Sequence, residues 1–336
     1  MADTIKIGNL DISAFKVGSD DCKVYLGDTL LYPTTPPTFS GKWLATYTGG
    51  TTSSAECDST SAITSGEITK TDLESVEIGD CVTSIGTQAF NYCTSLTSCT
   101  IGNGVTSINN YAFGSCYALT NIDLPNGFAS IGNYAFEYCG SLSSVTITDS
   151  VTRIGEGAFQ FCSGLTSVNI PSGVTSIDTY AFRNCGSLTT CIIGNGVTSI
   201  NNYAFYGCSG LTSINLPSGL TNIGSHTFRL CGGLTSVDIP NSVTSIGSST
   251  FRQCTNLRSV TIGNGVTSIG SNVFIDCTNL QSVTIKATTP PTLSNANSFN
   301  NTNNCPIYVP ASSVSTYKSA NNWSSLSSRI QAIPNS

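Results

Sequence analysis

The chain has 336 residues, only 10% of them charged, with a formal net charge of -6 at pH 7 and an isoelectric point near 4.6. This acidic balance argues against nucleic-acid binding, which needs clustered Lys and Arg to displace counterions from phosphates. No segment approaches the roughly 18 consecutive apolar residues of a membrane helix, so we expect no membrane insertion.

Residues 1–32 are predicted to form a small β-hairpin element. Apolar and polar residues alternate here in short runs, and Gly27-Asp28 separates two of them, as in a hairpin turn. The run from Val17 to Pro33 resembles a short element near the ends of structural proteins of tailed phages from gut bacteria. That resemblance implies attachment to other virion proteins through residues 1–32, and an ordinary capping hairpin is the alternative.

Two further segments precede the repeats. Residues 33–38 read Pro-Thr-Thr-Pro-Pro-Thr, which is stiff and predicts a linker. Residues 39–72 contain Trp43, Tyr47 and a Gly49-Gly50 turn, and we interpret them as an N-terminal cap. A first repeat without such a cap would expose its apolar face to water.

Residues 73–285 repeat one pattern every 23 residues without an insertion. The phenylalanines of this pattern are Phe90, Phe113, Phe136, Phe159, Phe182, Phe205, Phe228, Phe251 and Phe274. Three residues after each comes a cysteine: Cys93, Cys116, Cys139, Cys162, Cys185, Cys208, Cys231, Cys254 and Cys277. Such a fixed period predicts a solenoid whose repeats bury their apolar faces against their neighbours.

The repeat, written LxxVxIxxxVxxIGxxAFxxC, resembles the BspA-like or treponemal type of leucine-rich repeat over about two thirds of the chain. The resemblance implies a curved parallel β-sheet on one face of the solenoid, with turns or short helices on the other. Better-known members of this family are exported surface proteins. By contrast, Met1 to Lys6 lack the basic start and apolar run of a signal peptide, so we expect this chain to be made in the cytoplasm.

Residues 286–336 are predicted to form a C-terminal cap. The period breaks at Pro290-Pro291, a strand is expected at Ile307-Tyr308-Val309, and residues 311–330 have roughly helical spacing. A cap is needed because an exposed sheet edge invites stacking with another copy. A homo-oligomer is one of the possible partners of the chain.

The chain has 15 cysteines, and the nine of the repeat are expected to be reduced and buried as a column of small apolar side chains. Such a uniform, odd-numbered row makes a poor disulfide framework. With one histidine in the chain and no Cys-x-x-Cys pair, we expect no zinc site, no other metal and no cofactor. The six other cysteines are Cys22, Cys57, Cys81, Cys99, Cys191 and Cys305.

Two faces of the solenoid offer binding groups. The sheet should present a ladder of mostly small polar residues: Glu77, Thr100, Asp123, Thr146, Asn169, Ile192, Asn215, Asp238, Thr261 and Thr284. The candidate binding residues lie away from the sheet: Tyr92, Tyr111, Tyr134, Tyr138, Tyr180 and Tyr203. They could stack on the sugar rings of a host glycan or anchor a protein, or simply cover the Phe core. Arg183, Arg229 and Arg252 share another position and could form a basic stripe or a solvated face.

Enzymatic activity is not expected. His226 stands at a position that other repeats fill with tyrosine, which makes a catalytic triad improbable. The chain contains neither a phosphate-binding GxxxxGK[ST] nor a zinc-binding HExxH motif.

The resemblances lead to three hypotheses. The first is a non-enzymatic structural protein of a phage virion, acting as a decoration, fibre or host-contacting module. The second is an exported BspA-like adhesin on the bacterial cell surface, which requires export. The third is a purely structural virion component without a host ligand.

Overall fold

The computed structural model describes residues 41–57 and 62–334, together with the backbone of five short strands among the first 40 residues. The chain divides into two units, Met1–Ser40 and Gly41–Ser336. In the first unit, β1 (Ile5–Ile7) pairs antiparallel with β2 (Leu10–Ile12), and β3 (Lys16–Val17) pairs with β4 (Val24–Leu26). The hairpin expected around Gly27-Asp28 is present, because β4 pairs antiparallel with β5 (Thr29–Leu30). The remainder of the phage-like run and the proline-rich linker lie outside the described residues.

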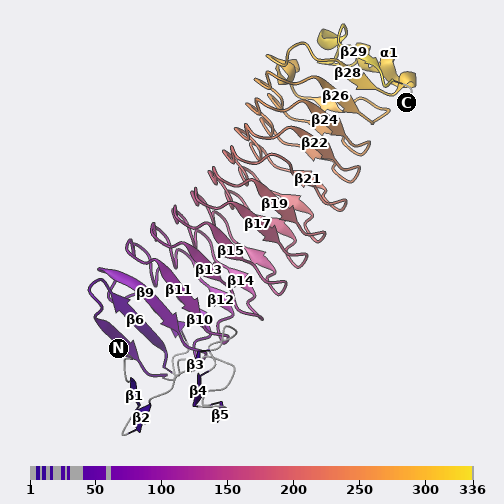
Figure 1. The fold of residues 1–336 in the computed structure, drawn as a ribbon. Coiled ribbons are helices and arrows are strands. Elements are labelled where there is room, and N and C mark those ends of the chain that lie inside the picture. Colours follow the sequence, from indigo (N-terminus) through magenta and orange to yellow (C-terminus); the bar gives the residue numbers. More distant parts are fainter. Residues whose placement is uncertain are drawn as a thin grey trace. The chain divides into compact units, whose positions relative to one another are not determined.

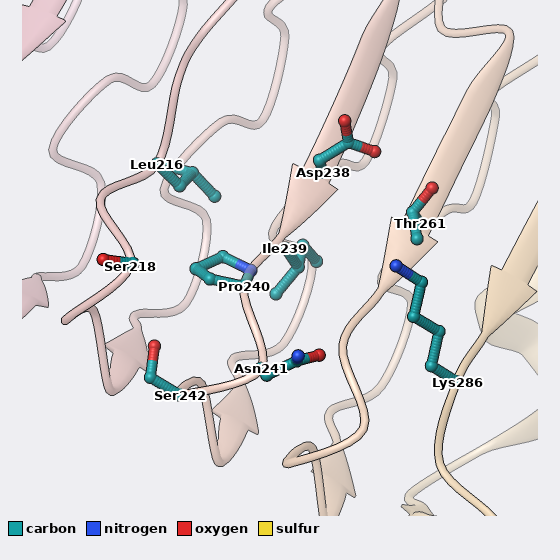
Figure 2. A pocket seen from close by; sticks show the side chains of 9 residues that line it. All are labelled: Leu216, Ser218, Asp238, Ile239, Pro240, Asn241, Ser242, Thr261 and Lys286. Carbon is teal, nitrogen blue, oxygen red and sulfur yellow. The ribbon is translucent and has the colours of Figure 1, made fainter.

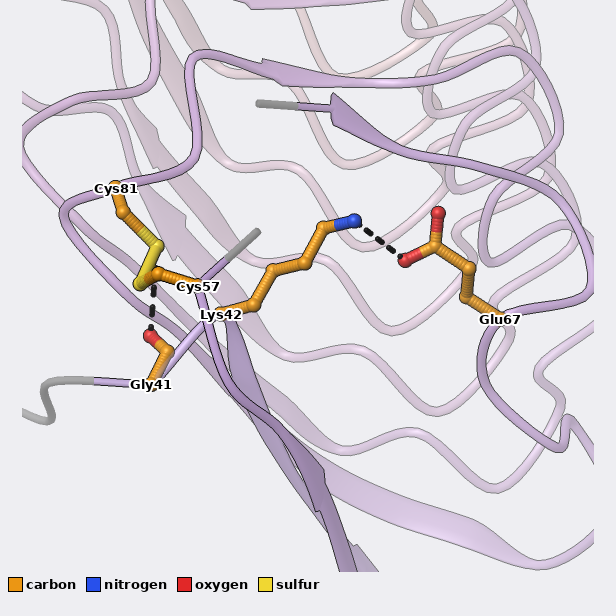
Figure 3. The surroundings of a disulfide bond; sticks show 5 residues. All are labelled: Gly41, Lys42, Cys57, Glu67 and Cys81. Atoms are coloured by element: carbon orange, nitrogen blue, oxygen red, sulfur yellow. Dashed lines mark hydrogen bonds and ion pairs between the residues drawn. A yellow bond between two sulfur atoms is a disulfide. The ribbon is translucent and has the colours of Figure 1, made fainter. Parts of the chain in front are cut away.

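The second unit begins with an antiparallel sheet. β6 (Trp43–Tyr47) pairs with β7 (Thr52–Ala55) on one side and with β9 (Leu73–Ile78), the first long strand of the repeats, on the other. Because β6 occupies the edge of β9, the repeats do not begin with an open sheet edge. Cys57 and Cys81 form a disulfide beside this sheet, and Lys42 and Glu67 point toward one another next to it (Figure 3).

The repeats form two rows of parallel strands that run along the unit (Figure 1). The row of longer strands contains β9, β11 (Ser98–Ile101), β13 (Asn121–Asp123), β15 (Ser144–Thr146), β17 (Ser167–Ile170), β19 (Thr190–Ile193), β22 (Ser236–Ile239), β24 (Ser259–Ile262) and β26 (Ser282–Ile285). Paired residues are 23 apart, as in Val260 and Val283. The expected repeat solenoid of the leucine-rich-repeat type is confirmed.

A second row of two-residue strands lies where turns or short helices were expected from the sequence. Its members are β8 (Ala62–Ile63), β10 (Ser84–Ile85), β12 (Ser107–Ile108), β14 (Ser130–Ile131), β16 (Arg153–Ile154), β18 (Ser176–Ile177), β20 (Ser199–Ile200), β21 (Asn222–Ile223), β23 (Ser245–Ile246), β25 (Ser268–Ile269) and β27 (Thr292–Leu293). Neighbouring strands of this row pair in register, except β16 with β18, and they bury their Ile or Leu side chains. The remainder of each repeat consists of turns, and residues 73–285 contain no helix.

The row of longer strands divides into separate sheets after β11 and after β15, and after β19 one repeat lacks its strand, which leaves a gap. Residues 211–216 carry the Leu-x-x-Ile-x-Leu pattern that contains β13 at residues 119–124, yet they form no strand between β19 and β22. The second row is continuous at the same level, since β20, β21 and β23 pair in sequence. The gap therefore changes one face of the solenoid and leaves the stacking of the repeats intact.

A stack of rings forms the centre of the core. All nine repeat phenylalanines are fully buried, and neighbouring rings lie parallel with centroids 5.0 to 5.7 Å apart. Burying one such side chain contributes about 1.5–3 kcal/mol, and an aromatic pair adds about 0.5–1.5 kcal/mol. The nine repeat cysteines are also fully buried and free of disulfides.

The C-terminal segment continues the solenoid and then covers its end. Phe299, in the 3-10 helix η1 (Ala296–Phe299), packs against both Phe274 and Trp323. Two parallel strands, β28 (Ile307–Val309) and β29 (Ile330–Ala332), extend the longer row. Between them lie η2 (Ala311–Ser313), α1 (Val314–Ser319) and η3 (Ser324–Leu326).

The helical spacing expected over residues 311–330 therefore produces an α-helix over six residues only. The helix stops at Ala320, whose backbone is extended. Asn322 then adopts a φ of 61°, a left-handed conformation that a right-handed helix does not accommodate. Trp323 turns inward from this bend, and its indole donates a hydrogen bond of 2.8 Å to the carbonyl of Pro291.

Candidate functional site: the turn face of the repeats

The turn that precedes each Ala-Phe pair directs one side chain away from the core. Tyr111, Tyr134, Tyr180, Tyr203 and His226 occupy this position in five repeats, with φ between 56° and 61°. Their amides are hydrogen bonded to the next repeat, as Tyr134 is to the carbonyl of Glu156 at 2.7 Å. These inter-repeat bonds hold non-glycine residues in a conformation that they otherwise rarely adopt.

The aromatic side chains at this position contact one another along the solenoid; Tyr111–Tyr134 and Tyr203–His226 are stacked, and Tyr180 and Tyr203 are tilted by 35°. The ring centroids are 5.0 Å apart between Tyr111 and Tyr134, 5.2 Å between Tyr180 and Tyr203, and 4.5 Å between Tyr203 and His226. Gly157 holds the same position between the two tyrosine pairs, with φ +58°. A Cβ at Gly157 would collide with the ring of Tyr134, so the glycine leaves room for that ring.

A second aromatic position lies just before the cysteine. Tyr138 stacks on Phe161 with a centroid distance of 4.5 Å. Tyr92 is 67% exposed and has no ring neighbour among the described residues. The six tyrosines singled out from the sequence thus do not form one continuous site: two pairs are in contact, Tyr138 pairs with Phe161, and Tyr92 stands alone.

This stacking bears on how the tyrosines can bind. A ring whose faces contact neighbouring rings offers mainly its edge and its hydroxyl to a ligand. Tyr134 already donates its hydroxyl proton to Glu156 at 2.6 Å, and burial together with this bond raises the pKa of Tyr134. Face-on stacking of sugar rings therefore fits Tyr92 better than it fits the paired tyrosines.

Between the two aromatic positions lies a row that we call the arginine row: Arg183, Tyr206, Arg229 and Arg252, the residues that follow Phe in four consecutive repeats. The guanidinium carbon of Arg183 lies 5.6 Å from the ring centroid of Phe161, 5.2 Å from that of Tyr180 and 5.4 Å from that of Tyr206. Arg229 lies 5.7 Å from the ring centroid of Tyr206. Cations at these distances are attracted by the ring faces.

The arginine row has no acidic partners within the described part of the chain. In that described part, the ion pair joins Lys42 and Glu67, which lie beside the N-terminal sheet and far from the arginine row in sequence. The Nε atoms of Arg183, Arg229 and Arg252 are buried and lack a hydrogen-bond acceptor. Burial, together with the charges of Arg229 and Arg252, lowers the pKa of His226. The arginine row is thus a cluster of three positive charges on an acidic protein.

The sheet face is polar and has a hollow beside residues 211–216. All ten residues expected to point outward there are exposed or half-buried, and Ile192, at 59% exposed, is the apolar exception. Where residues 211–216 form no strand, an open depression of about 630 Å³ is lined by Leu216, Pro240, Asp238, Thr261 and Lys286, among others (Figure 2). One carboxylate and one ammonium group face this hollow, so its formal charges cancel.

Over residues 41–57 and 62–334, no group of three or more His, Cys, Asp or Glu side chains is placed to hold a metal ion. His226 stacks on Tyr203, and its buried Nδ1 has no hydrogen-bond partner. In the same described part, no helix has the length and apolar character required to cross a bilayer.

Residues 61–189 and 175–306 match the model of the BspA type leucine rich repeat region. The chain belongs to the BspA-type leucine-rich-repeat family. No curated protein matches the chain.

Two solved structures place this BspA-type chain among its structural neighbours. A leucine-rich repeat protein from Bacteroides ovatus is 22% identical, with a TM-score of 0.62, over 99% of this chain and 81% of that chain. A leucine rich cell surface protein from Faecalibacterium prausnitzii is 24% identical, with a TM-score of 0.48, over 90% of this chain and 96% of that chain. The first likeness supports the solenoid fold.

Two features of this BspA-type chain were missed from the sequence. Tyr206 lies at the position of the three arginines and contacts two of them, and the identical repeat position was a signal that could have revealed it. The Cys57–Cys81 disulfide joins residues 24 apart, with Cα atoms 6.2 Å apart. Neither cysteine stands three residues after a repeat Phe, where the buried cysteines lie, and this difference could have indicated the disulfide from the sequence.

Proposed function

We propose that this BspA-type protein is a non-enzymatic binding protein of the bacterial cell surface, and that its turn face contacts the partner. The observation that carries this proposal is the arginine row with its flanking tyrosines. Tyr and Arg dominate the energetics of protein interfaces, whereas the Ser, Thr and Asn of the sheet face contribute little. The turn face is thus the better-equipped binding surface of the two.

Two observations support a location outside the cytoplasm. A disulfide between Cys57 and Cys81 persists in oxidising surroundings, such as the cell exterior, and is rare in the reducing cytosol. The family resemblance implies exported surface proteins. The buried thiols of the repeats are compatible with such surroundings because oxidants do not reach them.

The virion hypothesis has less support. Its motif, the run from Val17 to Pro33, lies largely outside the described residues. The matched family and the similar structures reported above include no phage structural protein. We therefore prefer the cell surface as the location of this protein.

Immunogold labelling of intact source cells and of purified phage particles from the same culture tests the location. We expect label on unpermeabilised cells, removable by external protease, and none on the particles. Label confined to particles, or label that appears only after cells are permeabilised, would contradict the proposal.

A second experiment tests the binding face. Full-length protein should adhere to the cells or matrix that the source bacterium colonises. An Arg183→Ala/Tyr206→Ala variant should adhere at least tenfold more weakly, as expected of interface hot spots. The matched control, Asn169→Ala/Asn215→Ala on the sheet face, should adhere as the unmodified protein does, and equal losses in both variants would argue against the turn face.

A further inference from the structure

We propose that the arginine row binds the acidic groups of an anionic polysaccharide, with the hydroxyl edges of Tyr180 and Tyr203 beside it. This inference rests on the proposed function and adds the chemical class of the ligand. The shared chemistry is a carboxylate or sulfate carried at intervals along a linear sugar chain.

The guanidinium of Arg183 is held in place before any ligand arrives. It lies against Phe161, Tyr180 and Tyr206, and its Nε is buried among them. In the described part of the chain, the other N–H groups of Arg183 and Arg252 have no protein acceptor, and one terminal nitrogen of Arg229 makes a long contact of 3.5 Å to Gln253. Ordered guanidinium donors suit carboxylate and sulfate oxygens because little side-chain entropy is lost on binding.

The positive charge has defined limits along the solenoid. Before Arg183 the same position holds Glu137 and Gln160, which hydrogen bond to each other at 3.1 Å. After Arg252 it holds the uncharged Ile275. Between these limits three cations lie within four consecutive repeats, whose core rings are 5.4 to 5.5 Å apart. A linear polyanion lying along the axis would meet all three, whereas a single small anion could reach at most two in adjacent repeats.

The backbone of this face argues against an extended acidic peptide as the ligand. The carbonyls of Tyr206, Arg229 and Arg252 already accept hydrogen bonds from Asn184, Gly207 and Leu230 of the preceding repeats. A peptide could therefore not add a strand here, which is the usual way in which extended peptides gain affinity. Recognition must come from side chains alone, which suits a polymer that presents acidic groups along its edge.

Single-stranded nucleic acid is also disfavoured. Its binding relies on aromatic ring faces that are open to stack on bases. In this region those faces contact one another or Arg183, as between Tyr203 and His226. The acidic polysaccharide is thus the polyanion that best fits the geometry.

The test measures binding of the full-length protein to immobilised polymers. The probes are heparin as the sulfated polysaccharide, polygalacturonate as the carboxylated one, dextran as a neutral one, poly-L-glutamate and oligo-dT. We expect binding to heparin, polygalacturonate or both, weakened by added salt, and no binding to dextran. Arg229→Gln/Arg252→Gln should reduce binding about tenfold or more, since each charge-assisted bond contributes appreciably.

The matched control is Lys286→Gln/Arg258→Gln, which removes the same charge from exposed residues outside the arginine row. It should bind as the unmodified protein does, and thermal unfolding should show that both variants are folded. Equal losses in both variants, poly-L-glutamate or oligo-dT bound as tightly as the polysaccharides, or no binding to either polysaccharide would overturn the inference. If the polysaccharide test failed while the protein was still labelled on the cell surface and still mediated adhesion, the proposed function would stand and only the ligand class would be wrong. Failure of the inference can thus be told apart from failure of the proposed function.

Discussion

The thiol of Cys162 donates a hydrogen bond to the carbonyl oxygen of Phe136, 26 residues earlier, with a sulfur–oxygen distance of 3.1 Å. The same bond recurs between neighbouring repeats from Cys116 to Cys277. Each thiol thus fills a small apolar site and also satisfies a carbonyl of the preceding repeat. Alanine would leave that site underfilled and donate no such bond, which accounts for cysteine at this position.

Burial of the repeat cysteines should make the stability of the protein sensitive to alkaline pH. Burial raises the pKa of both Cys139 and Cys208 to about 12, whereas an unfolded thiol has a pKa of about 8.5. Above about pH 8.5 the thiols ionise in the unfolded chain but stay neutral in the folded one, which favours unfolding. The stability that the neutral buried thiols provide is therefore present below about pH 8.5 and is lost as the pH rises toward the folded pKa. We expect the free energy of unfolding, measured with denaturant, to fall between pH 8 and 10, and to fall less steeply in Cys139→Ala.

Thiol labelling checks the same property directly. At pH 8.5 a thiol with a pKa of about 12 is ionised in roughly one molecule in three thousand. In a Cys22→Ser background, we expect none of the 12 free cysteines to react with a thiol reagent in the folded protein, and all 12 to react after unfolding. Rapid labelling of several cysteines without unfolding would contradict a closed core.

Much of the fold could be predicted because the 23-residue period constrains every repeat in the same way. A Phe that recurs at one position must meet its copies in neighbouring repeats, so the ring stack follows from Phe90 to Phe274. The missing strand at residues 211–216 could not be predicted, because the same Leu-x-x-Ile-x-Leu pattern at residues 119–124 does contain a strand, β13.

The candidate site was less predictable for a related reason. The 23-residue period places Tyr180, Arg183 and Tyr206 on the turn face. It does not determine which side chains from different repeat positions are in contact. The contact of Arg183 with three rings depends on side-chain directions across three repeats. The Cys57–Cys81 pair lies outside the periodic positions altogether and depends on how the N-terminal sheet folds back.

The disulfide should stabilise the N-terminal sheet against local opening. Closing a loop between residues 24 apart contributes about 3 kcal/mol in the chain-entropy account. We expect Cys57→Ser/Cys81→Ser to speed amide exchange in β6 and β9, while exchange in β24 and β26 stays unchanged, because repeats contact mainly their neighbours. Since both cysteines are exposed, a mild reductant should give the same result in the unmodified protein. Uniform loss of protection along the chain would contradict this local role.

The Lys42–Glu67 ion pair should contribute more than a typical surface pair. Its Nζ–Oε2 distance is 3.0 Å, and the Lys42 side chain is only 3% exposed. Glu67→Gln leaves the Lys42 charge without this ion pair in a buried setting, and we expect a loss of about 2 kcal/mol at pH 7. Thermal or denaturant unfolding measures it, and Glu74→Gln, at an exposed position, is the matched control with an expected change below about 0.5 kcal/mol.

The same pair has a defined pH dependence. Burial alone would raise the pKa of Glu67, but hydrogen bonds from Thr64 and Lys42 and the charge of Lys42 outweigh it and lower that pKa. The stabilisation is therefore present above the ordinary glutamate pKa and is lost as the pH falls through the lowered value. The difference in stability between the unmodified protein and Glu67→Gln should shrink below about pH 4. A difference that persists undiminished at pH 2 would show that the carboxylate charge is not its origin.

Gly157 and Tyr134 provide a test of the packing on the turn face. Gly157→Ala would bring a methyl group into the ring of Tyr134 at a backbone φ of +58°, and we expect a loss of about 2–3 kcal/mol from backbone strain and overpacking together. Gly127→Ala is the matched control, because Gly127 has φ +88° with open space around it, so only the backbone strain of about 1 kcal/mol applies. Adding Tyr134→Ala to Gly157→Ala should cost less than the sum of the two single changes, since the truncated ring no longer meets the methyl group. Strict additivity in this double-mutant cycle, measured by denaturant unfolding, would mean that the ring does not rest on Gly157.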